Sequence, residues 1–224
     1  MAATMLTVST VEAAFLADLP QRKINQVVDD DILPARLYQA SSRARRFMPV
    51  AAALAKFYFG AEKVMAAHAR KQVMAELVKR IHALPPAQTR QILALASAGA
   101  ETTWHVQPLD CVDVNLAGFV RQAMERFHIL QQVNDAIEST PDIMQGAAVF
   151  KGSRVPVGLV LGFLRQGDTL EALKQDYPFL TPELIELARV HEALHPQRGR
   201  PRTLARQFPA WQVEHKAIRP GAHA

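Results

Sequence analysis

The chain has 224 residues, of which 49% are hydrophobic, and a formal net charge of +5 at pH 7. Apolar runs such as MPVAAALA (48–55) are too short to cross a bilayer, and the first thirty residues lack the apolar core of a signal peptide. The single cysteine, Cys111, excludes an internal disulfide and a zinc site built from cysteines. These properties predict a cytoplasmic globular protein.

The positive charge is concentrated at the C-terminal end. Residues 196–224 contain six basic residues and one acidic residue, whereas residues 1–195 contain 20 of each, so this segment holds the whole net charge of +5. A basic segment is expected to bind phosphates or an acidic protein surface. A solvated, disordered end is the alternative, although such an end rarely carries side chains as large and apolar as Phe208, Trp211 and Ile218.

Two short helices are predicted within residues 1–40. Ser9-x-x-Glu12 is a capping-box pattern that starts the first helix, and Pro20 suits the first turn of the second. The residues expected on the buried faces are Val11, Ala14 and Phe15 in the first helix and Ile24, Val27 and Val28 in the second. Residues 29–31 are three consecutive acids, which are typical of a solvated helix end.

This helix pair is a candidate helix-turn-helix, with an ordinary helical hairpin as the alternative. The basic run SSRARR (41–46) that follows would either contact phosphate or serve as a connector. The residues in this part of the chain that we expect to contact DNA are Gln21, Arg22, Lys23, Asn25, Arg36 and Arg43.

The central residues predict further helices and a short β element. Residues 48–84 are expected to be helical in two pieces that meet near Gly60, and residues 87–98 and 115–137 form further predicted helices. Between them, residues 102–114 are rich in β-branched and aromatic residues and predict one or two strands.

The stretch VFKGSRVPVG (149–158) belongs to a last folded segment, which begins near Glu138. Two short extended pieces are expected on either side of Gly152, followed by three short helices. The helix over 158–165 ends at Gly167, the next is capped by Asp168 with Glu171 three residues later, and the last starts at Thr181-Pro182. Three short helices joined by tight turns again predict a unit of helix-turn-helix size.

No motif for catalysis or metal binding is found in the sequence. It contains neither a glycine-rich phosphate loop nor an H-E-x-x-H motif. His191 and His195 lie four residues apart and could chelate a metal, but it is more common for one such histidine to pack and the other to face water. We therefore expect no enzyme activity, no cofactor and no metal.

The run from Pro141 to Leu194 resembles the antitoxins grouped as domain-of-unknown-function family 433. The matching residues are Asp142, Gly146, the cassette Gly152-Ser153-Arg154-Val155-Pro156-Val157, Gly167-Asp168-Thr169 with Glu171, and Tyr177-Pro178-Phe179-Leu180-Thr181. One departure is QGAA (145–148), where the family often has Gly-Gly-x-Pro, and this change loosens one turn. The predicted N-terminal helix pair and the HPQRGRPR segment (195–202) also resemble the longer members.

The resemblance implies a VapB-type antitoxin of a type II toxin–antitoxin system. Its partner would be a PIN-domain ribonuclease toxin, whose acidic metal site a tethered guanidinium would neutralise. The implied toxin-binding residues are Arg198, Arg200, Arg202, Arg206, Phe208 and Trp211. A homodimer would also bind its own operator DNA. In the cassette, Arg154 would pair with Asp176, or Ser153 and Arg154 would touch a DNA phosphate.

The expected fold is therefore mainly α. It would consist of an N-terminal helix-turn-helix (1–40), a central helical and dimerisation region with short strands (41–137), a three-helix helix-turn-helix-like module (138–195) and a basic, extended tail (196–224). A stand-alone DNA-binding transcriptional regulator is the alternative function, in which the tail would hold DNA instead of a protein.

Overall fold

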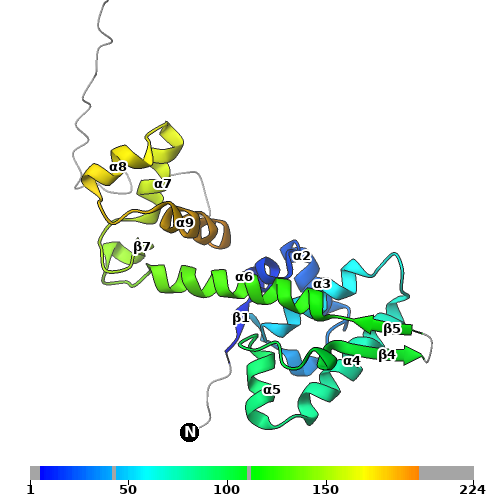
Figure 1. Ribbon diagram of the computed structural model, residues 1–224. Coiled ribbons are helices and arrows are strands. Elements are labelled where there is room, and N and C mark those ends of the chain that lie inside the picture. The colour runs from blue at the N-terminus through cyan, green and yellow to red at the C-terminus, as the bar shows by residue number, and fades with distance from the viewer. Residues whose placement is uncertain (1–5, 42–43, 110–111, 197–224) are drawn as a thin grey trace, which may run out of the picture. The chain divides into compact units, whose positions relative to one another are not determined.

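Helices dominate the computed structural model, which describes residues 6–41, 44–109 and 112–196 (Figure 1). Small antiparallel sheets accompany them, so the expected mainly α fold with a short β element is confirmed. The chain divides into two compact units, residues 1–135 and the residues from 136 onward. No helix within the described ranges is long and apolar enough to span a membrane.

The first unit begins with a helix pair joined to a three-stranded sheet. Strand β1 (Val8–Ser9) leads into α1 (Thr10–Ala17) and α2 (Gln21–Asp29), and the one-turn helix η1 (Ala35–Leu37) leads into the hairpin of β2 (Tyr38–Ala40) and β3 (Arg45–Phe47). The sheet is antiparallel in the order β1-β3-β2. Phe47 lies opposite both Val8 and Tyr38, so one face of this sheet is apolar and packs on the core.

The predicted start of α1 is confirmed, but its predicted buried face is partly wrong. Ser9 and Glu12 form the capping box, with Ser9 N–H donating to the Glu12 carboxylate (2.6 Å) and Glu12 N–H donating to the Ser9 hydroxyl (3.3 Å). The buried residues are Ala13, Ala14, Leu16 and Ala17, whereas Val11 and Phe15 are only half-buried. The small residues lie inward because α1 packs closely on both α2 and α3.

The second helix agrees better with its prediction. It starts at Gln21, one residue after Pro20, and buries Ile24 and Val27 completely, while Val28 is half-buried. The acids at 29–31 end this helix and are exposed, as the sequence indicates.

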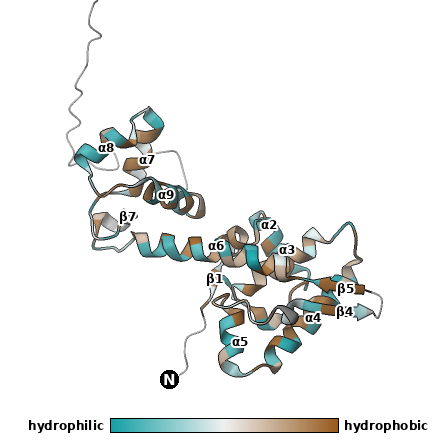
Figure 2. Ribbon diagram, viewed as in Figure 1, coloured by the Kyte–Doolittle hydropathy of each residue, from teal (hydrophilic) through white to brown (hydrophobic). Residues whose placement is uncertain are grey.

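The core of the first unit surrounds α3 (Val50–Gly60), in which eight of eleven residues are buried. The chain continues through α4 (Ala67–Ala83), α5 (Pro86–Leu93), η2 (Glu101–Trp104), the hairpin of β4 (His105–Leu109) and β5 (Val112–Asn115), and α6 (Ala117–Ala136). The break near Gly60 and the predicted strands are thus confirmed. Along α6, Figure 2 shows hydrophilic and hydrophobic residues alternating, as expected for a helix with one apolar face.

The helix predicted over 87–98 is shorter than expected. It begins at Pro86 and ends at Leu93, and Leu95 already has a left-handed backbone (φ 53°). Leu95 is nevertheless buried, so the apolar spacing that suggested a longer helix comes from a residue in the turn.

The second unit contains the cassette and three helices. Strand β6 (Ile137–Glu138) pairs with β7 (Val149–Phe150), and η3 (Met144–Gly146) lies between them in the chain. Helices α7 (Val157–Gln166), α8 (Leu170–Asp176) and α9 (Pro182–Leu194) follow as predicted, with α7 packed on α9. The core between them contains Leu159, Val160, Leu173, Ile185 and Ala188 of the helices and Leu180 of the connection before α9.

One predicted cap in this unit is wrong. Thr169, not Asp168, caps α8, because its hydroxyl accepts a hydrogen bond from Ala172 N–H (3.2 Å). Asp168 lies one residue too early, because α8 begins at Leu170. Its N–H belongs to the end of α7, where it donates to the carbonyl of Phe163 (3.2 Å) after the left-handed Gly167. The predicted cap of α9 at Thr181 is confirmed.

Candidate nucleic-acid interface

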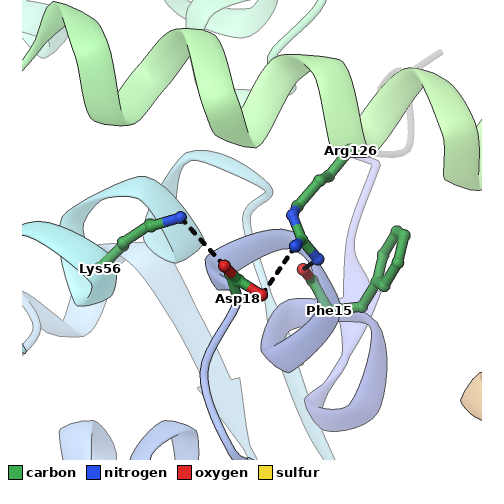
Figure 3. Close-up of polar contacts among 4 residues, drawn as sticks. All are labelled: Phe15, Asp18, Lys56 and Arg126. Atoms are coloured by element: carbon green, nitrogen blue, oxygen red, sulfur yellow. Dashed lines mark hydrogen bonds and ion pairs between the residues drawn. The ribbon is translucent and has the colours of Figure 1, made fainter.

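The turn between α1 and α2 is held by side chains from two other helices (Figure 3). Asp18 closes α1 in the left-handed conformation (φ 53°, ψ 47°). Arg126 of α6 donates one hydrogen bond to the Phe15 carbonyl (2.9 Å) and another to the Asp18 carboxylate (2.7 Å). Lys56 of α3 reaches the other oxygen of that carboxylate at 3.5 Å. Because α3 and α6 both bind this turn, they fix the direction in which α2 leaves it.

Two of the four α2 residues expected to contact DNA are available on its surface. Gln21 and Arg22 are exposed, and neither side chain has a partner in the part of the chain that the structure describes. Lys23 instead lies over the ring of Phe59, 4.0 Å from its centre. Asn25 accepts hydrogen bonds from Arg45, through its carbonyl and its side-chain oxygen, both at 3.2 Å.

Arg45 also ties the β2–β3 hairpin to α2. Its guanidinium lies 2.6 Å from the carboxylate of Asp29 at the end of that helix. The basic run 41–46 is therefore partly structural, since one of its arginines positions the hairpin. Arg46 lies on the opposite face of the sheet, opposite Gln39 in register, and is exposed. It is a candidate phosphate contact that the predicted residue set omitted, although its alternation with Arg45 and Phe47 in the sequence indicates its outward position.

The remaining predicted residues of this region lie in two places. Arg36 is exposed in η1, beside an open groove against α4. Arg43 lies outside the described residues.

The cassette at 149–158 forms a tight turn that joins β7 to α7. Phe150 N–H donates to the Val155 carbonyl (3.1 Å), and Val149 forms a β-bridge with Pro156. Ser153 donates its hydroxyl hydrogen to the Phe150 carbonyl (2.7 Å) and accepts from Val155 N–H (3.2 Å). Gly152 has φ 75°, and its N–H donates to the Glu138 carboxylate (3.2 Å). The sequence GSRVPV thus encodes a turn closed by its own backbone and hydroxyl.

The expected ion pair between Arg154 and Asp176 is not formed. Both side chains are exposed, and Arg154 makes no ion pair with any described residue. At such exposed positions an ion pair gains little free energy, so the turn does not depend on it. The Arg154 guanidinium remains available to a ligand, whereas the Ser153 hydroxyl is used within the turn.

A cavity of about 440 Å³ lies beside the cassette and contains the histidine pair of α9. The ring centres of His191 and His195 are 4.7 Å apart, with His191 half-buried and His195 exposed, as the sequence suggested. Burial lowers the pKa of His191, and the neighbouring His195 lowers this pKa further, whereas Glu192 raises it. Over the described ranges, no three histidine, cysteine or carboxylate side chains converge as metal ligands.

The predicted toxin-binding residues lie beyond the described ranges. They are Arg198, Arg200, Arg202, Arg206, Phe208 and Trp211.

Comparison with known proteins gives a family match, a similar protein and a similar solved structure. Residues 137–190 match the family described as protein of unknown function DUF433. The chain is 30% identical over 194 residues to uncharacterized protein y4eO of Sinorhizobium fredii (strain NBRC 101917 / NGR234), a match that covers 85% of this chain and 82% of that protein. The crystal structure of Rv2018 from Mycobacterium tuberculosis matches 81% of this chain and 96% of its own, with 22% identity and a TM-score of 0.37.

Proposed function

The chain belongs to the family of y4eO and carries a DUF433 segment. We propose, from the resemblance of its cassette and C-terminal segment to antitoxins, that it is the antitoxin of a type II toxin–antitoxin system. It would neutralise a PIN-domain ribonuclease toxin and bind its own promoter DNA. The observation that carries the proposal is that the whole net charge of +5 lies in residues 196–224, shortly after the DUF433 segment that ends at residue 190.

The charge supports inhibition of an acidic metal site. A guanidinium can place two parallel N–H donors on one carboxylate and compensate charge that the metal would otherwise balance. Phe208 and Trp211 supply aromatic groups, which dominate the binding energy of many interfaces. Loss of one arginine buried in such a site would cost about 2–5 kcal/mol of binding free energy.

The arrangement of the first unit supports the DNA-binding part of the proposal. Gln21 and Arg22 are exposed on a helix whose direction is fixed by Asp18 and Arg126, and Arg46 is exposed on the adjacent hairpin. A fixed helix with free polar side chains is what base contacts in the major groove require. A homodimer would present two such helices to a palindromic operator.

Co-expression with the adjacent open reading frame tests the proposal. The tagged chain should retain a PIN-domain protein and abolish its ribonuclease activity, and a chain ending at Pro196 should lose both properties. Arg198→Gln with Arg202→Gln should weaken retention, whereas Lys216→Gln with Arg219→Gln removes the same charge at positions outside the proposed contact and should not.

One outcome would contradict the proposed function, and another would contradict only the assignment of particular arginines to the toxin site. If no protein is retained but the chain binds its own promoter, the function is that of a stand-alone transcriptional regulator. If both double variants weaken toxin binding equally, the segment acts by total charge, and no particular arginine enters the toxin site.

A further inference from the structure

An open groove in the first unit collects basic side chains from two elements. It lies between the segment at η1 and the outer face of α4, with a volume of about 600 Å³. Its charged and titratable lining residues are Arg36 on one side and Lys79 and His82 on the other, and no carboxylate lines it. Its other lining residues are small or apolar, and they include Pro34, Ala75 and Val78.

The geometry of α4 explains why the groove is basic. Lys79 and His82 are three residues apart and therefore share a face of the helix. Ala75 lies one turn before Lys79 and provides room for a ligand to approach the helix backbone. The same helix is attached to the end of α2, since Lys71 donates a hydrogen bond to the Asp30 carbonyl (3.1 Å). The helix that lines the groove, α4, is thus bonded to the end of α2, the helix that is expected to contact DNA.

None of the three basic side chains has its charge satisfied by another residue that the structure describes. Arg36, Lys79 and His82 are exposed, and no hydrogen bond or ion pair of their side chains is found among the described residues. The acid closest in sequence is Glu76, and its carboxylate is held by Arg80 at 2.9 Å. That hydrogen bond is the main reason why the pKa of Glu76 is lowered, with Lys79 contributing a smaller charge effect. Lys79 therefore remains available to an external anion.

We propose that this groove binds a phosphate of the DNA backbone. Arg36 would form a forked pair with two phosphate oxygens, and Lys79 would neutralise the charge from the facing helix. Such contacts carry no sequence information but fix the register of the protein on the duplex. This inference rests on the DNA-binding part of the proposed function and adds a backbone contact outside the helix pair.

Charge removal in the groove tests the inference. In the full chain, Arg36→Gln and Lys79→Gln should each weaken binding to the promoter duplex and to an unrelated duplex by a similar factor. Each should reduce the slope of log affinity against log salt concentration by about 1, the value expected for one lost phosphate contact. Arg90→Gln and Lys63→Gln are the matched controls, because both residues are exposed and neither lines the groove.

The outcomes separate this inference from the proposed function. If the groove variants keep the slope and affinity of the unaltered chain while that chain binds its promoter, the groove proposal is wrong and DNA binding stands. If the unaltered chain binds no duplex, both the groove and the DNA-binding part of the proposed function are wrong. Retention of the toxin by Arg36→Gln would support the assignment of this groove to DNA, and loss of the toxin would contradict it.

Discussion

Asp18 is the residue on which the geometry of the helix pair depends most directly. Its left-handed backbone is a conformation that asparagine and aspartate tolerate better than most residues. Its carboxylate meets Arg126 and Lys56, which come from two helices that follow much later in the chain. One side chain therefore combines a local role in the turn with a tertiary role in placing α2.

Arg126→Gln should separate these two roles. We expect the free energy of unfolding in urea to fall by about 1 kcal/mol, because the variant loses the ion pair and the hydrogen bond to the Phe15 carbonyl. Asp18→Asn keeps the backbone preference but removes the charge, so its effect should overlap with that of Arg126→Gln when the two are combined. Arg121→Gln, an exposed position on the same helix, should change little. Strictly additive effects of the first two variants would show that the ion pair does not couple them.

His191 should make the stability of the second unit depend on pH. Burial and then His195 lower its pKa below the usual value of 6.5, so the folded unit binds fewer protons than the unfolded chain. The stabilisation is complete above pH 6.5 and is lost as the pH falls through the folded pKa. We expect urea unfolding of the second unit to require less denaturant under acidic conditions. His191→Gln should abolish this dependence, and His195→Gln should reduce it; an unchanged dependence in His191→Gln would assign it to other groups.

Most residue-scale predictions that depend on a local signal are confirmed, although the equally local cap at Asp168 is wrong because Thr169 caps α8. The capping box at Ser9 and the cap at Thr181 depend on residues three apart, and both are confirmed. The pairing of Arg154 with Asp176 is wrong, because no local pattern determines which distant charges meet. For the same reason the hydrogen bond from Arg45 to Asn25 could not be predicted.

At the scale of elements, the cassette shows how a short sequence can specify a turn. Gly152 supplies the positive φ, Ser153 bonds the backbone on both sides of it, and Pro156 leads into α7. The sequence predicted extended pieces around Gly152 and a helix after it. The sequence did not predict that β7 would pair with β6. Strand β6 is formed by residues 137–138, which precede the turn in the chain.

Two glycines of the second unit offer a matched test of this interpretation. A Cβ atom at Gly152 or at Gly162 would meet nothing within 4 Å, so only backbone conformation distinguishes them. Gly152→Ala should lower the free energy of unfolding by about 1 kcal/mol because of its φ of 75°. Gly162→Ala lies within α7 and should raise it by about 0.5–1 kcal/mol. Equal effects of the two substitutions in urea unfolding would mean that the left-handed turn is not a constraint.

Only part of the candidate nucleic-acid interface could be predicted from the sequences of its separate helices and strands. The helix pair follows from apolar spacing and caps, and Gln21 and Arg22 are exposed as expected. The basic groove was not predicted, although Arg36 was expected to contact DNA, because Arg36 and Lys79 come from segments that are far apart in the sequence and meet only in the folded chain.

At the scale of the whole molecule, the charge distribution predicts that one part of the chain determines the affinity for DNA and another part the preference for the operator. Residues 1–195 have equal numbers of acids and bases, and six bases follow them, so sequence-independent attraction to DNA should reside mostly in residues 196–224. In a chain ending at Pro196, the slope of log affinity against log salt concentration should decrease by up to about 5. The preference of this chain for the operator over a scrambled duplex should persist. Arg22→Gln should change the preference instead, with a slope change of about 1 at most. Bound toxin should decrease the slope as the truncation does, because in the proposed complex the toxin covers the same arginines. Loss of operator preference on truncation, with the slope retained, would place sequence reading in the C-terminal segment and contradict its assignment to α2.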